Sequence, residues 1–310
     1  MTAVARLLPD GRLHLQHGPM DLIVEAWGPE DTIRAAYARA WACFQPLLDE
    51  LVAEREALRA ADDRPVMGPT ARAMADAVRP FRPTFITPMA AVAGAVADRV
   101  LAALAGPGIT KAYVNNGGDI ALYLTPGQSL TAAIAGRAGL PDRVTICHDD
   151  PVRGIATSGW RGRSFSLGIA DAATILAPTA AMADAAATII ANAVELPGHP
   201  AITRRPAVEI KSDSDLGTRL VTTGVGLLSP HECAAALENG LRCGAAAMDR
   251  GLIVAAALCL QGQVRTLNSS MSPTLSFTNI PGGVRGGQRP PRRVAAKGGE
   301  TPARKEPSLV

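Results

Sequence analysis

Aromatic side chains are scarce in this sequence, at 4 % of 310 residues. Proteins that bind single-stranded nucleic acid stack the bases on aromatic rings, so this composition argues against that class of function. Apolar runs are also short: none reaches the roughly 18–20 residues that span a bilayer, and the N-terminus has no signal-peptide segment. We therefore expect a cytoplasmic protein that binds neither nucleic acid nor a membrane.

Cysteine patterns that hold metals or build disulfide frameworks are missing as well. The five cysteines are odd in number and widely spaced, and no CxxC pair occurs among them. The HExxH signature of metallohydrolases and the GxSxG signature of serine hydrolases are also absent. We expect buried, reduced thiols at Cys43, Cys147, Cys233, Cys243 and Cys259.

Charge is concentrated at the C-terminus. Residues 281–310 carry seven basic side chains against two acidic ones, a net charge of +5, which leaves −2 for the rest of a chain whose total is +3. With 47 % hydrophobic and 19 % charged residues, the chain has the composition of a globular protein. We predict one domain over residues 1–263 and a disordered, basic tail rich in Gly, Pro and Arg over residues 264–310.

Hairpins dominate the predicted secondary structure. Strands at 4–8 and 12–16 flank the turn Pro9-Asp10-Gly11, and a third strand follows at 21–27. The further predicted strands are 113–115, 120–124 paired with 130–135, 152–158 paired with 164–167, 170–176, 217–227 and a final strand at 252–261.

Helical spacing of apolar residues interrupts these strands. Residues 30–60 carry an apolar stripe that Pro46 should kink or split. Other helices are predicted at 71–78, 88–105, 180–194 and 231–247. Small residues fill the helices at 88–105 and 180–194, which implies close packing and is compatible with a homodimer. Because hairpins outnumber βαβ units, we predict an α+β fold of antiparallel sheets packed with helices.

The turn Asn116-Gly117-Gly118-Asp119 is the first candidate site. Two adjacent glycines leave backbone N–H groups unshielded, and such groups suit a phosphate or the edge of a flavin. The Asp119 carboxylate can accept hydrogen bonds from ligand hydroxyls or ring nitrogens. The alternative is an ordinary hairpin turn, for which Asn-Gly is the strongest sequence signal.

Residues 156–164 form the second candidate site. Thr157, Ser158, Gly159 and Arg163 place two hydroxyls, a glycine and a guanidinium group within one short segment, with Arg161 beside them. Such a combination suits an anion, because charged donors and hydroxyls bind phosphate or carboxylate oxygens. The alternative is a polar hairpin loop.

Asp184 and Thr188 form the third candidate site. They lie four residues apart in a predicted helix, so their oxygens share one face. A carboxylate and a hydroxyl suit Mg²⁺, which prefers hard oxygens and usually shares them with ligand phosphates. On an exposed helix the pair would simply be solvated, but the surrounding residues are small and apolar, and buried polar groups need a partner.

Together, these segments resemble the ApbE-like proteins, and most closely the group called UPF0280. The resemblance covers roughly residues 5–260 and is carried by PMAAVAGAVAD, NNGGDI, ATSGWRGRSFSLGIADA and MADAAATIIAN. Asp98-Arg99-Val100 also falls where the FAD:protein FMN transferases of the ApbE family commonly have Asp-Arg-Val. The chain departs from those transferases in two places. Val92-Ala93-Gly94 lacks the lysine that they usually carry there, and residues 161–166 contain neither the His nor the Asp-Pro of their corresponding segment.

The resemblance implies a T-fold-like architecture with a site for FAD or FMN. Gly117, Gly118 and Asp119 would contact the flavin nucleotide, and Asp184 with Thr188 would hold Mg²⁺ at the pyrophosphate. In the transferases, a hydroxyl of an acceptor protein then attacks and AMP leaves. Three functions stay open: FMN transfer, a related reaction on another phosphorylated or carboxylated small molecule in the same cleft, and non-catalytic binding of a ligand or partner.

Overall fold

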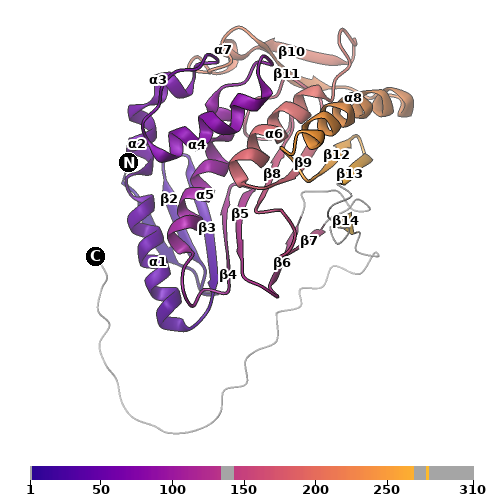
Figure 1. Ribbon diagram of the computed structural model, residues 1–310. Coiled ribbons are helices and arrows are strands. Elements are labelled where there is room, and N and C mark those ends of the chain that lie inside the picture. Colours follow the sequence, from indigo (N-terminus) through magenta and orange to yellow (C-terminus); the bar gives the residue numbers. More distant parts are fainter. Residues whose placement is uncertain (1, 134–142, 269–276, 279–310) are drawn as a thin grey trace.

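An antiparallel sheet runs through the centre of the protein (Figure 1). The computed structural model describes residues 2–133, 143–268 and 277–278, and within these ranges the sheet has nine strands in the order β1-β2-β3-β4-β5-β8-β9-β12-β13. Their bounds are β1 (Val4–Leu7), β2 (Leu13–His17), β3 (Met20–Trp27), β4 (Lys111–Asn116), β5 (Asp119–Leu124), β8 (Gly154–Ser158), β9 (Ala172–Ala177), β12 (Ala255–Leu260) and β13 (Gln263–Asn268).

The helices pack on one face of this sheet (Figure 1). They are α1 (Glu30–Phe44), α2 (Leu47–Ala53), α3 (Arg55–Leu58), α4 (Pro69–Val78), α5 (Val92–Leu104), α6 (Ala180–Ala193) and α8 (Pro230–Asp249), with short 3₁₀ turns at Arg79–Phe81 and Pro88–Ala91. Pro46 separates α1 from α2, as predicted. In the middle of the layer, α5 lies on β4 and β5 while α6 lies on β8 and β9.

The backbones of α5 and α6 approach each other unusually closely at Gly94. A Cβ atom on this residue would lie 2.2 Å from the carbonyl oxygen of Ala180. The small side chains predicted for these two helices are therefore used to pack them against each other within one chain. Hydrogen bonds to carboxylates also link the two helices in both directions. Asp98 of α5 accepts the N–H groups of Ala180 and Ala181 at 3.0 and 2.9 Å, and Asp184 of α6 accepts the Gly94 N–H at 3.0 Å.

Replacing Asp98 by Ala should destabilise the protein by about 1–3 kcal/mol, because two N–H groups at the start of α6 lose their acceptor. Burial raises the pKa of Asp98 to about 6, and these two hydrogen bonds act against that increase. Urea unfolding monitored by circular dichroism measures the change. Asp76→Ala is the matched control, because Asp76 is exposed and only bonds Arg79 on the surface. Equal losses in both variants would contradict this role for Asp98.

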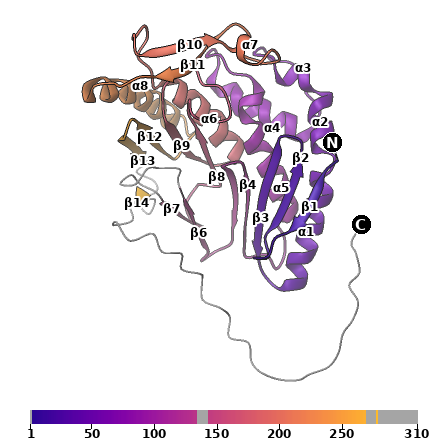
Figure 2. The ribbon, with the colours of Figure 1, turned by 180° about the vertical axis from the view of Figure 1, so that it is seen from behind.

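Two smaller sheets lie beside the main one (Figure 2). β6 (Ser129–Ala133), β7 (Arg143–Cys147) and β14 (Phe277–Thr278) form one of them, and Leu122, Leu124, Val144 and Ile146 belong to an apolar cluster between it and the main sheet. β10 (Ile202–Pro206) and β11 (Leu220–Val225), joined through α7 (Ala207–Ile210), form the other at one end of the molecule. The predicted α+β class, with antiparallel sheets and helices, is confirmed.

Two predicted strand pairs are wrong. The strand 120–124 does not pair with 130–135, because β5 already has β4 on one edge and β8 on the other, and β6 pairs with β7 instead. Residues 134 and 135 lie outside the described ranges. Residues 164–167 are not a strand: β8 is flanked by β5 and β9, and the Asn192 side chain accepts the Leu167 N–H at 2.8 Å.

The main sheet continues past the end predicted for it. β12 is followed by a turn at Gln261-Gly262, where both residues have positive φ, and then by β13, which reaches Asn268. This edge strand, Gln-Val-Arg-Thr-Leu-Asn, lacks a strict alternation of polar and apolar residues, and the sequence pattern did not reveal it. The basic segment 281–310, predicted to be disordered, lies outside the described residues.

Two predictions from composition can be compared with the structure. All five cysteines are free thiols, but only Cys233 is fully buried, so the expectation of burial was wrong for the other four. Among the described residues, no helix combines the length and apolar character that crossing a membrane requires.

Candidate functional site

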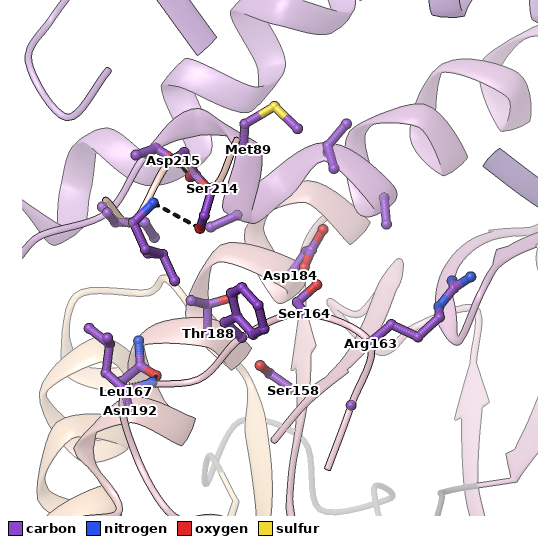
Figure 3. Close-up of a pocket in the computed structure, with 18 of the residues that line it drawn as sticks. Met89, Ser158, Arg163, Ser164, Leu167, Asp184, Thr188, Asn192, Ser214 and Asp215 are labelled. Carbon is purple, nitrogen blue, oxygen red and sulfur yellow. Dashed lines mark hydrogen bonds between the residues drawn. The ribbon is translucent and has the colours of Figure 1, made fainter. Parts of the chain in front are cut away.

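A cavity of about 490 Å³ opens where the β4–β5 turn, the end of β8 and α6 meet (Figure 3). Every site residue predicted from the sequence lines it except Gly118. The lining ones are Asn116, Gly117, Asp119, Thr157, Ser158, Gly159, Arg163, Asp184 and Thr188. Three motifs that are far apart in the chain therefore meet in one place, as expected of parts of a single site.

Two partly buried carboxylates, Asp119 and Asp184, face this cavity. The Thr157 N–H donates to Asp119 Oδ1 at 3.3 Å, and the Gly94 N–H donates to Asp184 Oδ2 at 3.0 Å. Burial raises the pKa of Asp119 to about 7, against the opposing effect of Arg163. The pKa of Asp184 is raised well above its usual range, first by burial and then by the charge of Asp119. Two carboxylates thus lie close enough in this cavity to influence each other's ionisation, and Arg163 is the cation that acts on Asp119.

The glycine turn between β4 and β5 lies directly under the Arg163 guanidinium group. Gly117 has a φ of +66°, and a Cβ atom there would lie 2.0 Å from Arg163 Nη2. Asn116 has a structural part: its side-chain amide donates to the carbonyl oxygen of Ala93 at 3.1 Å and so ties the turn to α5. Gly118 does not line the cavity, and its N–H donates to Asn115 Oδ1 at 2.8 Å.

The segment after β8 brings hydroxyl groups into the cavity. Within the described part of the chain, Ser158, Ser164 and Thr188 have no hydrogen-bond partner for their hydroxyls, whereas Thr157 Oγ1 lies 2.8 Å from Thr174 Oγ1. Figure 3 shows Ser158, Ser164, Asp184 and Thr188 in the centre of the cavity, with the Arg163 side chain extending away from Asp184. Arg161 does not line the cavity, because it pairs with Asp171 at 3.0 Å.

Several lining residues were not identified from the sequence. Asn192 continues the spacing of Asp184 and Thr188 by a further four residues, so the polar stripe on α6 could have revealed it. Further polar lining residues come from segments without a recognisable motif, namely Arg55, Arg59, Thr87, Lys211, Asp213, Ser214 and Asp215. No local pattern connects these segments, which are brought together only by the tertiary fold.

Comparison with known proteins gives a family and several relatives. The model of the family described as AbpE bacteria matches residues 5–266. The UPF0280 protein of Methanococcoides burtonii is 38 % identical over 119 residues, which cover 38 % of this chain and 49 % of that protein. The UPF0280 protein of Methanothrix thermoacetophila is 40 % identical over 113 residues, which cover 35 % and 46 %. The chain thus spans about half the length of the curated relatives it matches.

Among solved structures, the chain is similar to the apo form of the flavinyl transferase ApbE from Pseudomonas stutzeri. The TM-score is 0.43 and the identity 13 %, over 90 % of this chain and 99 % of that one. This likeness is too distant to assign a ligand to the cavity. The family match, in contrast, includes every residue that lines it. The chain therefore belongs to the AbpE bacteria family, the ApbE-like group to which its UPF0280 relatives point.

Proposed function

We propose that this protein binds a flavin nucleotide, FAD or FMN, together with Mg²⁺ in the cavity between the β4–β5 turn and α6. The observation that carries the proposal is the pair of carboxylates Asp119 and Asp184, which line the same cavity and whose pKa values are raised first by burial and, for Asp184, also by the charge of Asp119. A bound cation favours the ionised form of both groups. The glycine turn and the hydroxyls around the pair suit the phosphates of a nucleotide.

The donor set fits Mg²⁺ rather than a softer metal. Asp119, Asp184 and Thr188 line the cavity and offer hard oxygens only. Mg²⁺ is commonly held by one or two carboxylates, with substrate phosphates completing its shell. The cavity therefore suits a metal that binds together with a phosphorylated ligand.

FMN transfer to an acceptor protein is the reaction that this arrangement supports best. Bound Mg²⁺ would stabilise the charge that develops on the phosphates. Asp184 and Thr188 orient the phosphate end of the ligand, while Arg163 and the Gly117 backbone lie where they can bind phosphate oxygens. The acceptor would supply a Ser or Thr hydroxyl, whose oxygen forms the new bond to the phosphorus of the FMN half of FAD. The pyrophosphate P–O bond breaks, AMP leaves with its electrons, and the hydroxyl proton is released to solvent.

A second candidate is a related reaction on another phosphorylated or carboxylated molecule. Arg55, Arg59 and Lys211 also line the cavity, and they offer positive charge beyond what a single pyrophosphate beside Mg²⁺ requires. The absence of a lysine near Gly94 points the same way, since the FMN transferases that the sequence resembles usually carry one before their Asp-Arg-Val.

Calorimetric titration of the full chain with FAD, with and without Mg²⁺, tests the proposal. We expect Mg²⁺ to tighten FAD binding by at least about tenfold, because the metal neutralises the carboxylates that otherwise repel the phosphates. Incubation with FAD, Mg²⁺ and an acceptor, followed by mass spectrometry, then distinguishes FMN transfer from binding alone. FAD affinity that is absent or independent of Mg²⁺ would overturn the proposed site.

A further inference from the structure

A second set of charged side chains lines the cavity on the side of α3. Arg55 begins α3 and Arg59 directly follows it, whereas Lys211 directly follows α7. Figures 1 and 2 both show α3 and α7 at the same end of the molecule. We call Arg55, Arg59 and Lys211 the cationic end of the cavity. Lys211 is more than a hundred positions from the two arginines in the sequence, so their meeting is a property of the fold.

Tertiary contacts hold the segment that carries Lys211 in place. The Arg59 guanidinium donates to the backbone carbonyl of Asp213, and Thr87 Oγ1 donates to Asp215 Oδ2 at 2.6 Å. The Arg219 guanidinium lies 3.3 Å from the centre of the Phe85 ring. The cationic end is therefore a built part of the cavity wall, connected to the residues just before α5.

The donors of the cationic end are largely unused. Within the described part of the chain, the Arg55 guanidinium has no hydrogen bond or ion pair, and Arg59 uses one of the five N–H groups of its guanidinium. Lys211 Nζ lies 3.8 Å from Asp213 Oδ1, with both side chains about two-thirds exposed at 66 % and 63 %. Exposed pairs of this kind contribute little, so they do not prevent an anion from binding.

The neighbouring carboxylates mostly have other partners. Asp215 bonds Thr87, and Glu54 accepts the N–H groups of Met67 and Gly68 at 2.6 and 2.7 Å. Asp213 lies 3.8 Å from Lys211 Nζ. Because hydrogen bonds from neutral donors leave a carboxylate charged, the lining of this end holds three cations against the carboxylates Asp213 and Asp215, an excess of one positive charge.

We infer that the cationic end binds a second anionic group, a phosphate or carboxylate, without the help of a metal. The inference rests on the proposed function for the other end of the cavity, where Mg²⁺ and the nucleotide phosphates bind. FAD has its two phosphates adjacent to each other and no further anionic group. The second group therefore belongs either to a ligand that carries an additional phosphate or carboxylate, or to a second molecule that binds beside the nucleotide.

Metal-free titration with inorganic tripolyphosphate tests this inference. Without Mg²⁺, Asp119 and Asp184 offer no metal to which a phosphate could bind, so binding of the probe that depends on Arg55 and Lys211 reports on the cationic end. We expect wild-type binding that weakens as salt is added, and that weakens about three- to tenfold in Arg55→Gln and in Lys211→Gln. Arg72→Gln is the matched control, because Arg72 is an exposed arginine of α4 outside the cavity. Asp184→Asn should keep the metal-free binding.

The outcome separates this inference from the proposed function. Absent tripolyphosphate binding, or equal weakening by Arg72→Gln, overturns the inference even where FAD binds with Mg²⁺. Metal-free tripolyphosphate binding without any Mg²⁺-dependent FAD binding would overturn the nucleotide proposal instead. A competition titration then identifies the source of the anion. If FAD displaces tripolyphosphate, the FAD phosphates themselves occupy the cationic end, which overturns the inference of a second group. Independent binding of both supports it and assigns the group to a molecule other than FAD.

Discussion

Replacing Gly94 by Ala is expected to destabilise the protein by about 3 kcal/mol or more. Intrinsic helix propensity alone predicts the opposite sign, since Ala is favoured over Gly by about 1 kcal/mol inside a helix. The added Cβ would lie 2.2 Å from the oxygen and 2.4 Å from the carbon of the Ala180 carbonyl, both of them backbone atoms. Neither helix can relieve this overlap by a side-chain rotation, so the clash outweighs the propensity.

The measurement is thermal or urea unfolding of the two variants Gly94→Ala and Gly106→Ala. For a domain of this size, a loss of 3 kcal/mol lowers Tm by roughly 6–12 °C. Gly106 is a suitable control, because its nearest neighbour would be Arg39 Nη2 at 3.6 Å, an ordinary contact. Similar Tm values for both variants would show that α5 and α6 are not in such close contact.

Replacing Asp184 by Asn should remove the effect of Mg²⁺ on FAD binding. Asp184 is the carboxylate that we propose as metal ligand, and changing even an outer-shell group typically weakens metal binding 10–100-fold. We therefore expect the affinity for FAD in the presence of Mg²⁺ to fall by about tenfold or more, to the value of the metal-free protein. Calorimetry in matched buffers with and without Mg²⁺ measures both affinities.

The same variant should be more stable than the wild type in metal-free buffer at neutral pH. Folding raises the pKa of Asp184, so the folded state holds a proton that the unfolded state has already released. The contribution of this group to stability therefore falls as the pH rises from about 4 through the raised pKa. Asp184→Asn removes the loss of folding stability that Asp184 causes as the pH rises. Asp119, whose pKa is raised to about 7, still causes a loss of stability as the pH rises in this variant.

Asp213→Asn provides the control for both measurements. It removes an exposed carboxylate that lines the same cavity but lies outside the proposed metal site. This variant should retain the Mg²⁺ dependence of FAD binding and the pH dependence of unfolding. An Asp184→Asn protein that still responds to Mg²⁺, or that loses stability in metal-free buffer, would exclude Asp184 as a buried metal ligand.

The sequence was informative where local chemistry determines the structure. The turn Pro9-Asp10-Gly11 predicted the first hairpin, and Pro46 predicted the break between α1 and α2. The spacing of Asp184 and Thr188 placed both oxygens on one face of α6, which does line the cavity. In each case the signal lies within a few residues, because backbone restrictions and helical periodicity act over that range.

Features that depend on distant segments could not be predicted in the same way. The partner of β5 is decided by which strand reaches its free edge, and β8 occupies that position rather than β6. Arg55 and Lys211 meet at one cavity because the loop after α7 folds back against α3. No periodicity or turn chemistry encodes such a contact, and a single sequence offers no other record of it.

The two ends of the cavity have different origins along the chain, and this bears on how the protein can evolve. Asp119, Thr157, Asp184 and Thr188 all come from strands and helices of the central layers, whereas the cationic end comes from two flanking segments, 55–59 and 211–216. Insertions and replacements in surface segments are tolerated far more readily than changes among packed helices. A lineage can therefore exchange what it recognises at one end while inheriting the carboxylates at the other unchanged.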